Sequence, residues 1–173
     1  MIKGDNELSV ESILQSLKEL TNVHKQLCNV SQQKTEALKK GSSEKLQDIL
    51  SEEQTYIRKL EQVENNRERI VEQWFENNQP TEQERTITKI LNLLTDENEK
   101  RRLEVATIDL TKEITRLRDL EQLNAALIQQ SMHFIQTSLN MLKPTLQSLN
   151  YDRQQTKNDQ KRYNDRSMFD SKA

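Results

Sequence analysis

Apolar side chains recur at steps of three and four residues from Ser9 to about Lys40. This spacing is the period of one face of an α-helix. Gly41 follows directly, and glycine commonly ends a helix because it accepts the left-handed backbone conformation. The pattern predicts a first long helix over residues 9–40, with these positions on its apolar face: Val10, Ile13, Leu14, Leu17, Leu20, Val23, Leu27, Val30, Ala37 and Leu38.

The same period returns after a short break. Ser42 or Ser43 can cap a second helix, because a serine hydroxyl accepts a hydrogen bond from the first backbone N–H groups. The sequence "NNQP" at 77–80 ends the pattern. A second long helix is therefore expected over about 43–77, with these apolar positions: Leu46, Ile49, Leu50, Tyr56, Ile57, Leu60, Val63, Ile70, Val71, Trp74 and Phe75.

Two further helix starts follow close together. Thr81 with Glu84, and then Asp96 with Glu99, have the spacing of a capping box, in which two side chains bond to the first backbone N–H groups of a helix. The first box predicts a short helix over 81–94 that acts as a corner piece. The second predicts the start of a third long helix that no glycine or proline interrupts before Pro144. This helix would span about 46 residues, or about 70 Å.

Helices of this kind pack side by side. Hydrophobic residues make up only 32% of the chain, and there are two glycines and two prolines, which favours long helices with narrow apolar seams over a layered globule. We expect an all-α fold: an elongated antiparallel helical bundle of coiled-coil type, with three long helices and one short helix, over residues 1–150. Residues 151–173 are rich in charge and lack an apolar period, so they are predicted to be a disordered tail.

A window without charge interrupts this pattern near the end of the third long helix. The 21 residues from Gln122 to Leu142 contain no Asp, Glu, Lys or Arg, although 31% of the chain is charged and about six would be expected. The window also carries six Asn and Gln side chains, whose burial in lipid would be unfavourable. A membrane span is therefore not expected here.

The apolar side chains of this window form two stripes on the expected helix. At 100° per residue they cover an arc of about 180°, whereas a helix normally presents about 100° to its own core. The small Ser131 and Ser138 lie between the stripes. One stripe is thus in excess, and we predict a partner-binding surface made of Leu120, Leu123, Leu127, Ile128, Met132, Phe134, Ile135, Leu139, Met141 and Leu142.

Two other interpretations of the wide face stay open. A central bundle helix would bury it between two neighbouring helices of the same chain. Alternatively, a structural coiled-coil protein would use it to form a homo-oligomer. The flexible Met132 and Met141 and the lack of charge on the opposite face favour the partner-binding interpretation.

Composition excludes several other functions. The net charge of -2 offers no basic field for a phosphate backbone, so nucleic acid is not an expected partner. Cys28 is the only cysteine and "MIKGDNELSV" does not have the pattern of a secretion signal, so we expect a cytoplasmic protein. Neither His24 nor His133 has a companion at metal-ligand spacing. With no phosphate loop, nucleophile elbow or paired catalytic carboxylates, we expect no cofactor, no metal and no enzyme activity.

Two segments together resemble a known family. The stretch "ALKKGSSEKLQDILSEEQTYIRKLEQVENNRERI" (37–70) is similar to the turn and Leu-rich second helix of the FlgN-type flagellar export chaperones, in the form found in Gram-positive bacteria. "LNAALIQQSMHFIQTSLNMLKP" (123–144) resembles the third helix of that family, and "SMFDSKA" (167–173) its terminus.

The resemblance implies a cytosolic chaperone of type III secretion in flagellum assembly. Such a protein binds the disordered amphipathic C-terminal segment of flagellar hook-associated proteins, which form the junction between hook and filament. It keeps them unpolymerised and delivers them to a component of the flagellar export gate. A monomer is expected, with the homo-oligomer through the third helix as the alternative.

Overall fold

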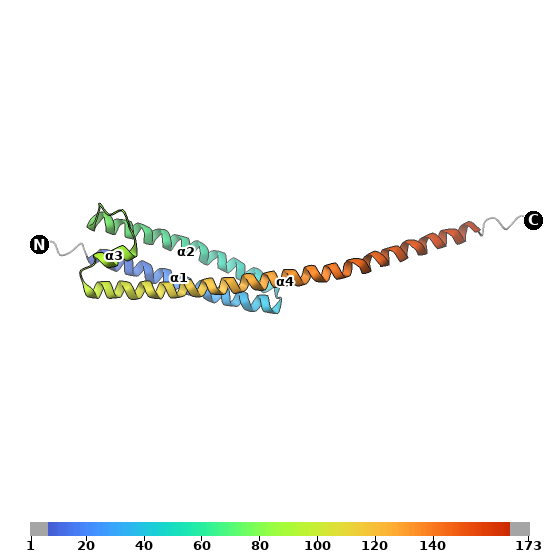
Figure 1. Ribbon diagram of the computed structural model, residues 1–173, viewed down its shortest axis with the longest axis horizontal. Coiled ribbons are helices and arrows are strands. Elements are labelled where there is room, and N and C mark those ends of the chain that lie inside the picture. The colour runs from blue at the N-terminus through green and yellow to red at the C-terminus, as the bar shows by residue number, and fades with distance from the viewer. Residues whose placement is uncertain (1–6, 167–173) are drawn as a thin grey trace, which may run out of the picture. The chain divides into compact units, whose positions relative to one another are not determined.

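The computed structural model describes the backbone of residues 7–166 and the side chains of residues 10–142. Within that range the chain forms four helices, α1 (Glu7–Lys40), α2 (Ser43–Asn78), α3 (Ile87–Leu93) and α4 (Glu97–Arg166), and no strand (Figure 1). The all-α prediction with three long helices and one short helix is confirmed. The chain divides into two compact units, Met1–Leu127 and Ile128–Ala173.

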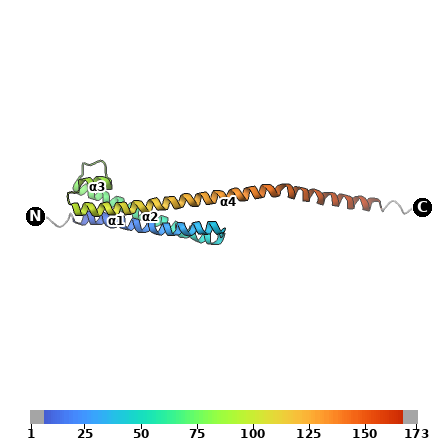
Figure 2. The same ribbon diagram turned by 60° about the horizontal axis from the view of Figure 1, so that its bottom comes forward.

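The first unit is an up, down, up bundle of the three long helices. Lys34 on α1 pairs with Glu53 on α2, so α2 returns antiparallel to α1. By contrast, Glu11 pairs with Arg102 near the start of α4, and later residues of α1 meet later residues of α4. α1 and α4 therefore run in the same direction, which both views show for this unit (Figures 1 and 2).

α1 is the helix with the widest buried face. Nine of its ten predicted apolar positions are buried, and Leu38 is half-buried. Several polar residues of α1, among them Ser16, Thr21 and Ser31, are buried as well. The central position in the first unit thus belongs to α1, and α2 and α4 each pack against it.

Bulky side chains gather where α3 meets the three long helices. Trp74 and Phe75 lie at the end of α2 with their ring centroids 5.0 Å apart at an interplanar angle of 84°. This edge-to-face arrangement is a favoured geometry for aromatic pairs. Ile90 from α3 and Leu103 from α4 are fully buried in the same cluster. α3 therefore closes this end of the core, as expected for a corner piece.

The turn between α1 and α2 follows from one glycine. Gly41 has φ +64°, the left-handed conformation that ends many helices. The N–H of Ser42 donates to the carbonyl of Ala37 at 3.1 Å, and the N–H of Gly41 donates to that of Leu38 at 3.2 Å. This pair of bonds is a Schellman motif, and it confirms the predicted helix end. Ser42 occupies the cap position of α2, but its side chain makes no capping hydrogen bond.

The predicted start of the short helix was wrong. α3 begins at Ile87, where the Thr86 hydroxyl accepts the N–H of Lys89 at 3.2 Å. The expected box at Thr81 does not form, because Glu82 accepts the N–H groups that follow it and pairs with Lys89 at 2.9 Å. These contacts hold residues 81–86 in an irregular turn instead of a helix.

The second predicted start is confirmed. Asp96 Oδ1 accepts the N–H groups of Asn98 at 2.7 Å and Glu99 at 3.1 Å, and α4 begins at Glu97. At its other end α4 continues past Pro144 to Arg166. A proline within a helix removes one backbone hydrogen bond, and neighbouring residues can continue the helix at that cost. The division into a bundle over 1–150 and a tail over 151–173 stays a prediction, and residues 167–173 lie outside the described residues.

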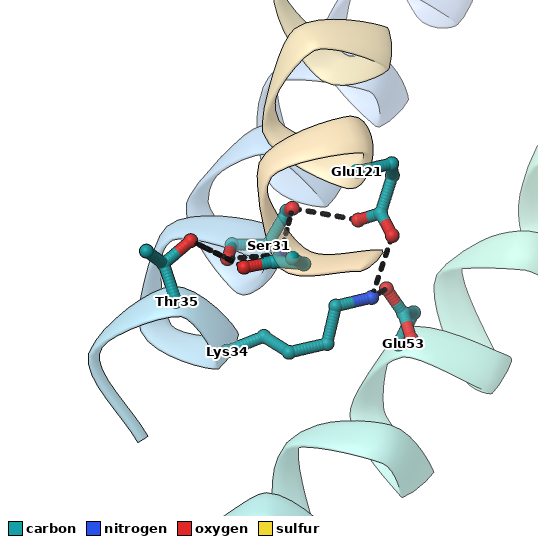
Figure 3. A network of polar contacts seen from close by, with 6 residues as sticks. Ser31, Lys34, Thr35, Glu53 and Glu121 are labelled. Atoms are coloured by element: carbon teal, nitrogen blue, oxygen red, sulfur yellow. Dashed lines mark hydrogen bonds and ion pairs between the residues drawn. The ribbon is translucent and has the colours of Figure 1, made fainter. Parts of the chain in front are cut away.

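A polar layer holds the three long helices together near the α1–α2 turn (Figure 3). Lys34 Nζ lies 2.5 Å from Glu53 Oε1 on α2 and 2.8 Å from Glu121 Oε2 on α4. The side chains of Lys34 and Glu53 are 8% and 15% exposed, whereas that of Glu121 is 41% exposed. Burial acts to lower the pKa of Lys34, but hydrogen bonds to Glu121 and Glu53 raise this pKa above its usual value. One ammonium group thus joins all three helices.

The same layer continues between α1 and α4. Thr35 Oγ1 donates to Asn124 Oδ1 at 2.6 Å, and Asn124 Nδ2 donates to the carbonyl and the hydroxyl of Ser31, both at 3.0 Å. Ser31 Oγ in turn donates to Glu121 Oε1 at 2.6 Å. Because each group has a specific partner, the layer favours one register of α4 against α1.

Candidate functional site

The uncharged window lies on α4, and in the second unit its apolar side chains are exposed to solvent. Five of them are between 42% and 64% exposed: Ile128, Met132, Ile135, Leu139 and Leu142. Their spacing of four, three, four and three residues places them along one face of the helix. We call these five side chains the apolar stripe.

Two further apolar side chains lie beside the apolar stripe. Phe134 and Met141 are each 72% exposed and are seven residues, or two helical turns, apart. Between the stripe and this pair, Ser138 donates its hydroxyl to the carbonyl of Phe134 at 2.9 Å. A small side chain here leaves room for another helix to come close to the backbone of α4. The predicted binding residues of the second unit therefore lie together on one broad apolar face.

The remaining predicted residues belong to the first unit and are placed differently. Leu120 and Leu127 are half-buried, whereas Leu123 is 45% exposed. The less exposed positions of α4 in this unit follow steps of three and four residues, as in a coiled-coil seam. The positions on this row are Leu103, Ala106, Leu110, Glu113, Leu117, Leu120, Asn124 and Leu127, and Glu99, Lys100, Thr107 and Glu121 are half-buried beside it. Leu120 and Leu127 thus lie on the packed row of the helix, while the five stripe residues and Leu123 are accessible.

The electrostatic character of the window follows from what surrounds the stripe. Its polar members are amides, hydroxyls and His133, and no Asp, Glu, Lys or Arg is among them. A surface of this kind contacts a partner through apolar burial and neutral hydrogen bonds. Binding to it should consequently depend little on ionic strength.

The structure gives other reactive side chains a packing role. Cys28 is buried, with Sγ 3.7 Å from the carbonyl oxygen of Glu113, and burial raises the pKa of its thiol. His24 is hydrogen-bonded through Nδ1 to the carbonyl of Leu20 at 2.9 Å. Among the side chains that the structure describes, no three His, Cys, Asp or Glu residues gather as metal ligands would.

In the described part of the chain, no helix has a segment long and apolar enough to span a membrane.

The polar layer was missed in the sequence. Ser31, Lys34 and Thr35 interrupt the apolar period of α1 between Val30 and Ala37, and that interruption was the available signal. Their partners Glu53 and Glu121 look like ordinary surface carboxylates in the sequence. Only the packing of the helices brings them to Lys34.

Comparison with known families gives the family of this chain. The family model described as "FlgN protein" matches residues 1–159, which is most of the chain. The chain belongs to the FlgN family. Membership of the FlgN family implies a general role as a flagellar export chaperone that binds flagellar proteins. The resemblance read from residues 37–70 and 123–144 is therefore confirmed.

A curated relative covers the same length. The "Uncharacterized protein YvyG" of Bacillus subtilis (strain 168) is 32% identical over 169 residues, which are 96% of this chain and 100% of that protein. This relative from a Gram-positive bacterium agrees with the Gram-positive form of the FlgN family. No solved structure matches the chain.

Proposed function

We propose that this FlgN-family protein is a cytosolic, non-enzymatic chaperone that binds the amphipathic C-terminal segments of flagellar hook-associated proteins. In this proposal it keeps its clients unpolymerised and delivers them to the export gate of the flagellar type III secretion apparatus. The client segment folds as a helix on the apolar stripe of α4. The observation that carries the proposal is the exposure of that uncharged stripe in a chain in which 31% of the residues are charged.

The exposed stripe supplies enough apolar surface for specific capture. Complete burial of an Ile, Leu or Met side chain contributes about 1.5 to 3 kcal/mol, so covering the exposed half of each contributes about 1 kcal/mol. Five stripe residues together with Phe134 and Met141 then give a gross gain of roughly 7 to 9 kcal/mol. Part of this is offset by the ordering of a disordered client. The binding free energy that remains is consistent with binding that is specific and still reversible.

The geometry also explains how capture would prevent polymerisation. A segment that assembles through its own apolar face cannot assemble while that face lies on another helix. The 4-3-4-3 spacing of the stripe complements the spacing of an amphipathic helix, which is the helix-in-groove mode of recognition. Release requires no chemical step, because the contact contains no covalent bond and no metal.

Homo-oligomerisation through the same stripe is the alternative function. It would also bury the exposed apolar side chains, and it would leave the protein indifferent to a client. In that case the stripe is the seam of a dimer or tetramer.

Mass in solution separates the two functions. Size-exclusion chromatography with light scattering is run on the full chain, with and without a synthetic peptide from the C-terminal region of a hook-associated protein. The proposed function predicts a monomer that gains one peptide. A stable dimer or tetramer with unchanged mass in the presence of the peptide would contradict it.

A further inference from the structure

A second surface, in the first unit, lies between α1 and α4. A groove of about 690 Å³ follows the line where these two helices pack together. Its apolar floor includes Leu14, which is buried, together with Ala106 and the exposed Val105. A floor of this kind is open to an apolar side chain of another molecule.

The walls of this groove are basic. Four cationic side chains line it, Lys18 and Lys25 from α1 and Arg101 and Arg102 from α4, against one carboxylate, Asp109. This excess of positive charge stands out in a chain whose net charge is -2. The groove therefore differs from the rest of the molecule in the sign of its charge.

Three of these cations are available to a partner. Arg102 pairs with Glu11 at 2.5 Å. Lys18, Lys25 and Arg101 are exposed, and none of them has an ion pair with a carboxylate among the residues that the structure describes.

The groove has the dimensions of a helix-binding site. From Leu14 to Lys25 it follows twelve residues of α1, or about 16 Å, which is about three helical turns. Two helices packed side by side leave a groove into which a further helix can pack by the same ridge-into-groove contacts. Lys18 and Lys25 are seven residues apart, so two carboxylates seven residues apart on such a helix would meet both.

We propose that this basic groove docks an acidic amphipathic helix of a partner protein. Apolar side chains of that helix cover Val105 and Ala106, and its carboxylates pair with Lys18, Lys25 and Arg101. Charge complementarity favours this partner, because its carboxylates would neutralise the three cations that have no ion pair among the described residues. The inference goes beyond the proposed function, since the apolar stripe is uncharged and lies in the second unit, whereas this groove is charged and lies in the first.

A pair of designed peptides tests the proposal. The probe is an 18-residue helical peptide with Leu and Ala along one face and Glu on both flanks of that face, and its counterpart has Lys in place of each Glu. Binding of each to the full chain is measured by fluorescence anisotropy at low and at high salt. We expect binding of the Glu peptide only, at least tenfold weaker at 0.5 M salt than at 0.05 M.

Variants of the full chain locate the contact. Lys18→Glu with Lys25→Glu should weaken binding of the Glu peptide at least tenfold, because it reverses two exposed charges of the groove. Lys45→Glu with Lys59→Glu makes the same charge change on α2 and should leave binding unchanged. Trp74 fluorescence confirms that both variants keep the bundle core.

Three results would each overturn the proposal. They are the absence of binding by the Glu peptide, equal binding of the Glu and Lys peptides, and equal losses in the two double-charge variants. A third variant, Ile135→Asp with Leu139→Asp, must still bind the Glu peptide. If that variant loses binding, the peptide occupies the apolar stripe and the groove is not its site.

Discussion

Replacing Lys34 should strongly destabilise the first unit. Replacing Lys34 with Met removes the ammonium group that joins α1, α2 and α4, and leaves two carboxylates facing each other across the bundle. The Glu53 carboxylate is the more affected, because its side chain is only 15% exposed and Lys34 is its one ion-pair partner among the described residues.

The expected loss of stability follows from the exposure of the Lys34, Glu53 and Glu121 side chains. Breaking a buried ion pair by removing one partner costs about 3 to 5 kcal/mol when the remaining charge is fully buried. Glu121 is 41% exposed and keeps its bond from Ser31, so it stays solvated. We therefore expect Lys34→Met to lower the free energy of unfolding by about 2 to 3 kcal/mol.

A double-mutant cycle isolates the polar layer. Glu53→Leu alone should lower the free energy of unfolding by about 1 to 2 kcal/mol. The double variant Lys34→Met with Glu53→Leu should have a free energy of unfolding within about 1 kcal/mol of the parent, because an apolar pair replaces the ionic one. Lys39→Met is the control, since its exposed pair with Glu36 contributes at most about 0.5 kcal/mol. Urea unfolding followed by Trp74 fluorescence measures all four variants.

The pH dependence gives an independent check. The pKa of Lys34 is raised in the folded chain, so its stabilising contribution is fully present below its unfolded value of 10.5 and is lost as the pH rises through the folded pKa. The difference between parent and Lys34→Met should therefore shrink above pH 10.5. Additive losses in the cycle, or a cost of Lys34→Met below 0.5 kcal/mol, would refute the reasoning.

Three further predictions concern local structure. Gly41→Ala should lower the free energy of unfolding by about 1 kcal/mol through backbone strain alone, since a Cβ there meets nothing within 4 Å. Ser42→Ala should change the free energy of unfolding little, because the Ser42 hydroxyl makes no capping hydrogen bond. Urea unfolding compares the two variants. Asp96→Ala should cost about 1 kcal/mol by the same assay, with Thr81→Ala neutral, and equal effects would show that the assignment of caps is wrong. Cys28 should react with iodoacetamide at least tenfold more slowly in the folded chain than in urea, because it is buried and its thiol pKa is raised; equal rates would contradict its packed position.

Periodicity predicted the helices because apolar spacing and end signals agree for most of this chain. Gly41 and Asp96 act through local backbone chemistry, which neighbouring residues determine. Thr81 failed as a start signal because Glu82 competes for the same N–H groups and is held by Lys89. A choice between two nearby caps depends on such tertiary contacts, which spacing does not contain.

Which side chains of the candidate site are exposed could be predicted only in part from the sequence. An uncharged window with a wide apolar arc predicts a surface that the chain itself does not fully cover, and the exposed stripe agrees with that expectation. The sequence did not separate Leu120 and Leu127 from the stripe, because their burial depends on the register of α4 against α1. That register depends in turn on Asn124, which has the appearance of an ordinary surface amide until Ser31 and Thr35 are placed beside it.

Calorimetric titration of the full chain with a C-terminal peptide of a hook-associated protein tests the central claim most directly. The account predicts one-to-one binding with a negative heat-capacity change. The double variant Ile135→Asp with Leu139→Asp should weaken this binding about 30-fold or more, because it removes about 2 kcal/mol of apolar contact. Gln129→Asp with Gln136→Asp adds the same charge to exposed positions off the stripe and should bind like the parent. Unchanged binding in the stripe variant, or no binding by a folded monomeric parent, would contradict the account.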